Sequence, residues 1–322
     1  MRRRRTLTTV VRRLAEGTAL VAALSFGLFW LLARMPGDPL DALLATDPGL
    51  TTTDIAQLRK AQGLDDPIPV RYGRWLRRLV VERDPGFSRV HKRPVLEVLQ
   101  GRTTSTLKLM AGALGLSLAL AIPIGALSAI RRHTVFDHGI TLMTFAGLSI
   151  PAFWLGLVAI ITFALWLPLF PAGGSPTPGA GLLEQLRFLA LPMLVLAFET
   201  TGGWTRYVRA SATEALGSDY VRTARAKGLP ESTVVLRHGL ANALVPLATV
   251  VALSGPGLFS GAVVTETVFA WPGMGRLLYD SVLGTDHAVA LTSFLTLATL
   301  TILFNLLADL AHSWLDPRAQ LP

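Results

Sequence analysis

Few side chains in this sequence could act chemically inside an apolar environment. Two carboxylates, Glu199 and Glu266, lie within or at the end of long uncharged runs, where a charge is costly and usually faces a cavity or a partner. Glu199 is therefore a candidate for a substrate pathway, or it pairs with Arg206 or Arg209. Glu266 is a candidate gate residue or partner contact, or it caps the turn at 271–273.

The residue types needed for catalysis or metal binding form no recognisable site. The chain has no cysteine, which excludes disulfides and thiolate ligands, and its six histidines form no H-x-x-x-H pair. Ser254 and His238 could suggest an intramembrane protease, but Ser254 lacks the G-x-S-x-G context and His238 lies in a basic segment. No G-x-x-x-x-G-K-[ST] loop occurs, so the chain has no Walker-type nucleotide cradle. We expect no catalytic, metal or cofactor site.

The composition is typical of a membrane protein. The sequence is 51% hydrophobic and 16% charged, whereas soluble domains carry about 25% charged residues. A net charge of +9 could indicate nucleic-acid binding in a soluble protein. Here the basic residues lie largely between apolar runs, so membrane topology explains them better and we expect no nucleic acid.

Six apolar runs are long enough to cross a hydrocarbon core, which needs about 20 helical residues. Backbone polar groups in lipid must bond within their own segment, which predicts helices. The runs are 17–33, 109–130, 139–167, 188–205, 239–265 and 288–308. The expected fold is an all-α bundle of six transmembrane helices. We expect a basic N-terminus (1–13), a first span (14–34), an outer segment (35–107), a five-span core (108–314) and a tail (315–322).

The basic residues also predict the orientation of the chain. With the N-terminus inside, fifteen arginines and lysines lie in inner segments, and two, Arg187 and Arg276, lie in short outer loops. The segment 35–107 carries further basic residues, but it exceeds the length of about 60 residues above which this rule loses force. Both termini are therefore expected in the cytoplasm. The basic N-terminus and first apolar run could also be a cleaved signal peptide, but the run is long and no small-x-small site follows it.

The outer segment 35–107 has the pattern of short amphipathic helices. Thr53 or Asp54 can begin one that ends at Gly63. After Pro67 and Pro69, apolar and basic residues occupy largely opposite helical faces: Val70, Trp75, Leu76, Leu79 and Val80 against Arg71, Arg74, Arg77 and Arg78. This helix either lies on the membrane or bundle surface or forms a docking site for a partner.

The inner loop 206–238 has the pattern of a helical hairpin. Asp219 can cap a helix over 220–227, Gly228 suits the position after its end, and Pro230 can open a second helix. Such an exposed hairpin would present a rigid shape to another protein. The alternative is a surface loop that is basic only for topology, which explains neither its length nor the Gly-Leu-Pro turn.

This loop also carries a family resemblance. Residues 219–229, DYVRTARAKGL, resemble the EAA loop of binding-protein-dependent ABC importer permeases in its dipeptide/oligopeptide/nickel form. The loop's usual Glu-Ala-Ala is here Arg222, Thr223 and Ala224, and Gly228 occupies the glycine position. Further segments resemble the same branch in order over about 280 residues: MPGDP (35–39), GLDDP (63–67), FDH (136–138), SIPAFW (149–154), TETVFAWPGMGR (265–276), LLADL (306–310) and DPR (316–318).

The resemblance implies a permease in a bacterial cytoplasmic membrane that forms half of a pore with a second, related permease. It implies two ATPase subunits that bind ATP and Mg²⁺ and an extracytoplasmic solute-binding protein. The coupling helix over 219–231 would then contact an ATPase through Asp219, Tyr220, Arg222, Thr223, Ala224, Arg225, Ala226, Lys227, Gly228, Leu229 and Pro230.

The substrate and the transport class are the points on which alternatives stay open. Di- and oligopeptides are the first expectation, and nickel or a metal–chelator complex is the second. An ion-coupled carrier or channel is a more distant alternative, because the sequence shows no internal repeat and few charges within the apolar runs.

Overall fold

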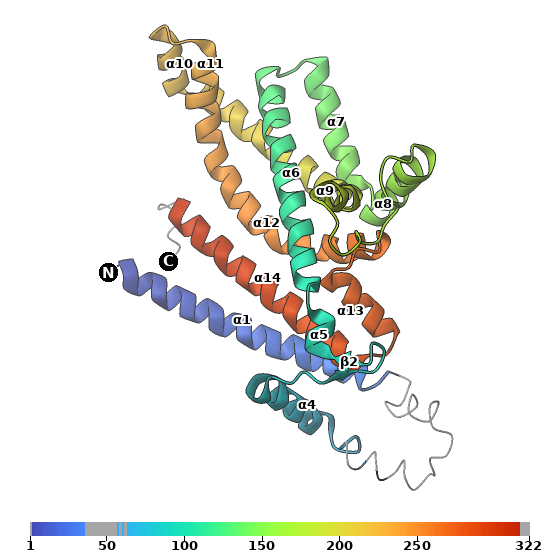
Figure 1. Cartoon of the computed structure of the whole chain (residues 1–322). Helices are drawn as coiled ribbons and strands as arrows, with labels where there is room; N and C mark the ends of the chain where they lie inside the picture. Colours follow the sequence, from blue (N-terminus) through green and yellow to red (C-terminus); the bar gives the residue numbers. More distant parts are fainter. Residues whose placement is uncertain (1, 36–56, 58–59, 61–62, 316–322) are drawn as a thin grey trace. The chain divides into compact units, whose positions relative to one another are not determined.

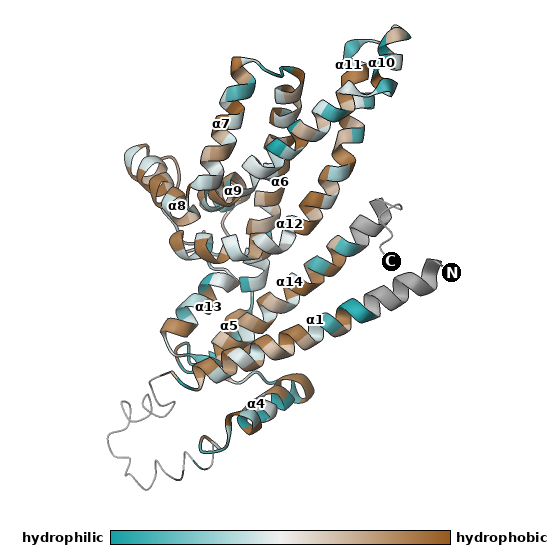
Figure 2. Ribbon diagram, turned by 180° about the vertical axis from the view of Figure 1, so that it is seen from behind, coloured by the Kyte–Doolittle hydropathy of each residue, from teal (hydrophilic) through white to brown (hydrophobic). Residues whose placement is uncertain are grey.

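The computed structural model describes residues 2–35, 57, 60 and 63–315, and these are mostly helical, as expected. The chain divides into two compact units, which are considered separately below. The first comprises Met1–Gln100 and Leu277–Thr299, and the second comprises Gly101–Arg276 and Leu300–Pro322. Figure 1 labels the elements, and Figure 2 shows that apolar residues run along the long helices of each unit.

The first unit combines one long helix with several short elements. Its two strands pair in an antiparallel manner, with Phe87 opposite Pro94 and Ser88 opposite Arg93. The elements are α1 (Arg2–Leu32), α4 (Ile68–Arg77), the π-helical turn η1 (Arg78–Glu82), β1 (Phe87–Ser88), β2 (Arg93–Pro94), α5 (Val95–Leu99), most of α13 (Met274–Leu283) and the start of α14 (His287–Leu315).

The amphipathic helix expected after Pro67 is present as α4 and packs on α1. The ring of Tyr72 lies edge-on to Phe26 and Phe29, and its hydroxyl is 2.8 Å from the Ser25 hydroxyl. The expected helix start at Thr53 or Asp54 lies outside the described residues. Its expected end, Gly63, has a φ of 63°, which suits a glycine after a helix.

The second unit is built around three long helices. α9 packs along both α6 and α12, and Ala121, Trp204 and Leu247 meet in one buried cluster between them. The elements are α6 (Arg102–Ile130), α7 (Val135–Ser149), α8 (Ala152–Ile160), the π-helical turn η2 (Ile161–Trp166), α9 (Leu182–Gly217), α10 (Asp219–Ala226), α11 (Glu231–Thr233), the π-helical segment η3 (Val234–Leu240) and α12 (Ala241–Val268).

Small residues allow α6 and α9 to approach closely. A Cβ added at Gly125 would lie 2.7 Å from the Thr205 carbonyl oxygen, and one at Gly112 would lie 2.7 Å from the Met193 sulfur. The Ser117 hydroxyl donates to the Ala197 carbonyl oxygen over 2.9 Å. Small residues commonly allow such close backbone approach at helix interfaces in membranes.

Four described helical segments are long and apolar enough to cross a membrane: Arg12–Leu32, Val95–Ile130, Glu231–Gly255 and His287–Asp309. α7 and α8 could together supply a fifth, although they meet at an angle of 102°. The span expected over 139–167 thus corresponds to two helices that are bent at Pro151, and its crossing of the membrane as one span stays a prediction. Ile150, which precedes Pro151, has an extended backbone (φ −87°, ψ 123°), because proline disfavours the helical conformation in the residue before it.

The fourth expected span, 188–205, lies within α9, which is 36 residues long and includes Glu199. α9 is not among the helical segments that are apolar enough to cross on their own. The structure thus supports a polytopic, mostly helical chain, and the count of six spans stays a prediction.

Candidate functional site: the helical hairpin after α9

The expected hairpin is present, with two differences from the sequence interpretation. α10 begins at Asp219, and its cap residue is Ser218 rather than Asp219, because Ser218 is the last extended residue before the helix (φ −74°, ψ 157°). Pro230 does precede a helix, but α11 continues through η3 into α12 rather than ending as a short second helix. Gly228 turns the chain with a φ of 74°, as expected for the residue after a helix end.

A small apolar cluster holds the two arms of the hairpin together. Val221 and Ala224, one helical turn apart on α10, pack against Val234 at the start of η3, and all three are buried. Ala224 therefore faces the second arm, whereas the other ten predicted coupling residues are exposed. Ala224 would thus support a docking surface from beneath rather than contact a partner.

An ion pair joins the two arms of the hairpin beside the Gly228 turn. The Arg225 guanidinium donates to both Glu231 carboxylate oxygens, from Nη2 over 2.7 Å and from Nε over 3.2 Å. This two-bonded geometry ties α10 to α11 across the glycine turn. Arg222 and Asp219 form a weaker exposed contact of 3.5 Å one turn earlier.

The base of the hairpin is packed against the end of α9. A Cβ at Gly239 of η3 would lie 2.6 Å from the Leu216 side chain, so a larger residue at this position would force Leu216 to shift. The hairpin thus continues from α9 on one side and into α12 on the other, as the ribbon shows (Figure 1). A force applied to α10 would be transmitted to both long helices.

Glu199 does not form an ion pair with Arg206 or Arg209, which was one of the two interpretations of this residue. Arg209 instead bonds Asp137, and the Arg206 guanidinium lies 4.8 Å from the centre of the Phe145 ring. Glu199 is exposed on the surface of its unit and has no hydrogen bond or ion pair with any described residue. The carboxylate lies close to α12, since a Cβ at Gly261 would be 3.0 Å from its Oε2. The pathway role stays a prediction.

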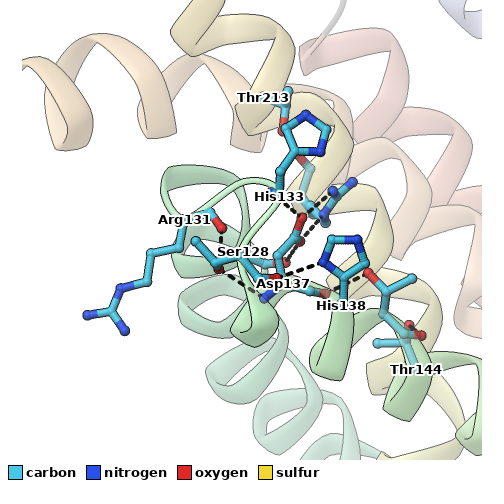
Figure 3. A network of polar contacts seen from close by, with 10 residues as sticks. Ser128, Arg131, His133, Asp137, His138, Thr144 and Thr213 are labelled. Carbon is cyan, nitrogen blue, oxygen red and sulfur yellow. Dashed lines mark hydrogen bonds and ion pairs between the residues drawn. The ribbon is translucent and has the colours of Figure 1, made fainter.

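A buried ionic network joins the α6–α7 turn to α9 (Figure 3). The Asp137 carboxylate accepts hydrogen bonds from the Arg209 Nη2 over 2.7 Å, the His133 backbone N–H over 3.0 Å and the Ser128 hydroxyl. The Asp137 side chain is 3% exposed and that of Arg209 is 30% exposed. Thr134 caps α7 by accepting from the Asp137 backbone N–H.

Sequence reasoning missed this pairing. It treated residues 136–138 only as a family-like segment and Arg209 as a topology charge or a partner of Glu199. The available signal was an acidic residue in the first turn after a basic break between two apolar runs, because a carboxylate in such a place needs a cation.

The Glu266 carboxylate is hydrogen-bonded to other residues of the second unit. Its buried carboxylate accepts from the Thr106 hydroxyl over 2.6 Å, the Gly275 N–H over 2.8 Å and the Arg276 N–H over 3.1 Å. These bonds tie the end of α12 to α6 and to the start of α13. The geometry favours the stabilisation of the 271–273 turn, and the gate role of Glu266 stays a prediction.

Comparison with known proteins covers nearly the whole chain. Residues 121–321 match the family of the binding-protein-dependent transport system inner membrane component, and residues 6–121 match the N-terminal family of the same membrane component. The hairpin, the Asp137 network and Glu199 all fall within the first match.

Three relatives are similar along their full lengths. The oligopeptide transport system permease protein AppB of Bacillus subtilis is 38% identical, over 97% of this chain and 98% of its own. In Escherichia coli, a probable D,D-dipeptide transport system permease protein, DdpB, is 38% identical, and the dipeptide transport system permease protein DppB is 33% identical, both with the same coverage. The chain belongs to the family of binding-protein-dependent transport system inner membrane components, and it is an ABC importer permease.

Proposed function

We propose that this chain forms half of the translocation pathway of an importer for di- and oligopeptides. The relatives named for oligopeptide and dipeptide transport support the substrate class, since each is similar over 97% of this chain. In this proposal a second, related permease forms the other half. A solute-binding protein delivers the peptide, and two ATPase subunits bind ATP and Mg²⁺.

The single observation that carries the proposal is the exposed hairpin of α10 and α11. It joins two long helices without a flexible connection, and the Val221–Val234 contact and the Arg225–Glu231 ion pair keep it rigid. A rigid projection of this kind suits a groove in an ATPase. When ATP brings the ATPases together, the hairpin would carry that movement into α9 and α12.

The nucleotide can shift the permease between inward- and outward-facing states only if the ATPases bind those states differently. In the proposal, docking of the hairpin provides this difference. The permease itself performs no chemical step, and no nucleotide or metal ion is assigned to this chain.

The proposed topology has six spans, both termini in the cytoplasm and the hairpin on the cytoplasmic side. α9 is the proposed span that most needs contact with a partner, because it carries Glu199 and is not among the described helical segments that are apolar enough to cross on their own. An exposed carboxylate on such a helix would be tolerated if it faced a water-filled pathway shared with the second permease. Glu199 is therefore our proposed pathway residue.

Peptide uptake by the complete transporter tests the substrate class. Proteoliposomes that contain both permeases, both ATPases and the binding protein should accumulate a radiolabelled tripeptide when ATP is supplied. Unlabelled dipeptides and tripeptides should compete, and nickel chloride should not. A transporter that accumulates radioactive nickel and no peptide would contradict the peptide assignment while leaving the importer intact.

A further inference from the structure

A cavity of about 320 Å³ lies within the first unit, and none of the residues that line it belongs to the hairpin or to α9. Its walls come from the last turn of α1, from α4, from the segment around β1 and from the first turns of α14. Apolar side chains supply one side, including Phe29, Leu32 and Leu291, and Trp75 lies beside them. The Trp75 indole N–H is buried and has no acceptor among the described residues.

The charged residues that line this cavity leave an excess of positive charge. Arg74 pairs with Asp66, and Arg78 pairs with Asp84 over 2.6 Å. This second contact, with the Arg78 guanidinium, holds the pKa of Asp84 below its ordinary value, so Asp84 is ionised and its charge is compensated.

The remaining acidic residue of the cavity is also satisfied. Asp286 accepts from the Ser88 hydroxyl over 2.5 Å and from the Val90 backbone N–H over 3.4 Å. Arg71 and Arg89 line the cavity and have no acidic partner among the described residues. Both lie close enough to His287 for their charges to act on it, so they converge on one region.

The position of the cavity along the helices identifies its level relative to a membrane. The candidate span in α1 ends at Leu32, and the candidate span in α14 begins at His287. Both residues line the cavity. A span begins and ends where hydrocarbon gives way to headgroups, so these two candidate spans would place the cavity at the depth of lipid phosphates. Figure 2 shows the mixed hydropathy of α4 beside the apolar end of α1.

We propose that this cavity binds the phosphate-bearing headgroup of an anionic phospholipid. Arg71 and Arg89 would bind the phosphate, and Phe29, Leu32 and Trp75 would contact the glycerol and upper acyl chain. An inorganic phosphate would use the arginines but not the apolar wall, and a peptide carboxylate would not explain a site at the ends of two spans. The bound lipid would fasten α4 to the ends of α1 and α14.

The test is a titration of the purified, delipidated transporter with dioctanoyl phosphatidylglycerol, followed by native mass spectrometry. The variant R71Q/R89Q removes both unpaired charges. The matched control is R77Q, because Arg77 is an exposed arginine on the same helix that does not line the cavity. R71K/R89K keeps the charges and checks that the binding change is electrostatic.

We expect R71Q/R89Q to weaken lipid binding about 25-fold, since each basic residue near an anionic headgroup contributes about fivefold. R77Q should stay within about twofold of wild type, and R71K/R89K should recover most of the binding. Dioctanoyl phosphatidylcholine and inorganic phosphate should compete at least about tenfold more weakly than phosphatidylglycerol. Equal binding by wild type and R71Q/R89Q would overturn the site, and so would stronger competition by inorganic phosphate or by trialanine than by the lipid.

Discussion

A carboxylate that is 3% exposed, like that of Asp137, keeps its charge only while its partners remain in place. Arg209 supplies the one cation among these partners, and the Ser128 hydroxyl and His133 N–H supply neutral donors. Removing one member of a buried pair costs more than the pair itself contributes, because the other charge is left without a partner. The network therefore depends on both of its charged members.

We expect Arg209→Gln to lower the free energy of unfolding by about 2–3 kcal/mol. This loss is smaller than the usual cost of breaking a buried ion pair, because the Arg209 side chain is 30% exposed. The apparent melting temperature of the purified transporter should fall by roughly 5 °C. Asp137→Asn combined with Arg209→Gln should lose less than the two single changes added together. Arg206→Gln is the matched control, because Arg206 contacts Phe145 and bonds no carboxylate within the described part of the chain. An equal loss in that control would contradict the assignment.

Glu199 differs from Asp137 because its charge has no partner among the described residues, so a change there should affect transport and not folding. We expect Glu199→Gln to change the KM or the rate of peptide uptake at least about threefold, while the melting temperature stays within about 2 °C. Uptake by proteoliposomes and thermal melting measure the two quantities. A variant that melts early and transports normally would show that Glu199 is structural.

At the scale of elements, two glycines of α6 differ sharply in their surroundings, and one of them lies at the contact with α9. A Cβ at Gly125 would meet the Thr205 carbonyl and Val208 at 2.7 Å, whereas one at Gly115 would meet nothing within 4 Å. Both glycines lie in α6, so the pair separates packing from helix propensity.

We expect Gly125→Ala to destabilise the protein by about 1–3 kcal/mol, because the backbone of α9 must move. Gly115→Ala should be neutral or stabilising by up to about 1 kcal/mol, because alanine favours a helix more than glycine does. Thermal melting of the two variants in the same detergent measures the difference. Identical behaviour would mean that α9 does not lie against α6 as described.

The hairpin turn depends on the left-handed backbone of Gly228. Gly228→Pro fixes φ near −65° and removes the N–H that donates to the Arg225 carbonyl over 2.9 Å. It should abolish copurification of the ATPases while leaving membrane insertion intact. Gly228→Asn should retain most of the copurification, because asparagine tolerates the left-handed backbone conformation. Normal copurification with the proline variant would remove the coupling role of the turn.

Local sequence signals predicted the elements better than they predicted the contacts between them. Gly228 and Pro230 marked the hairpin because their backbone preferences act within a few residues. The Ser218 cap was missed because Ser and Asp are both good cap residues and only the backbone decides between them. The bend of 102° between α7 and α8 depends on how α8 packs on α9 and α12, which local sequence does not reveal. The Asp137–Arg209 pair joins residues 72 positions apart, which no local pattern reveals.

For the whole molecule, the family and the hairpin together support our proposal of a permease that is moved by other subunits. The chain is related to oligopeptide and dipeptide permeases over nearly its full length. Four of its described helical segments are long and apolar enough to cross a membrane, and α9 and α12 lead directly into the hairpin. The central claim is that this hairpin is the surface through which the ATPases act.

Site-specific cross-linking of the hairpin to the ATPase tests this claim most directly. The chain has no cysteine, so Ala226→Cys introduces a single thiol on the exposed surface of α10. The control is Leu182→Cys, which is also exposed and lies at the other end of α9, about 50 Å away along the helix.

The account predicts that a short cysteine–lysine cross-linker joins the Ala226→Cys permease to an ATPase subunit in the intact transporter, and that Leu182→Cys gives no such product. ATP should change the yield, because closure of the ATPases moves the docked hairpin. A transporter that hydrolyses ATP yet cross-links from position 182 and not from position 226 would contradict the account.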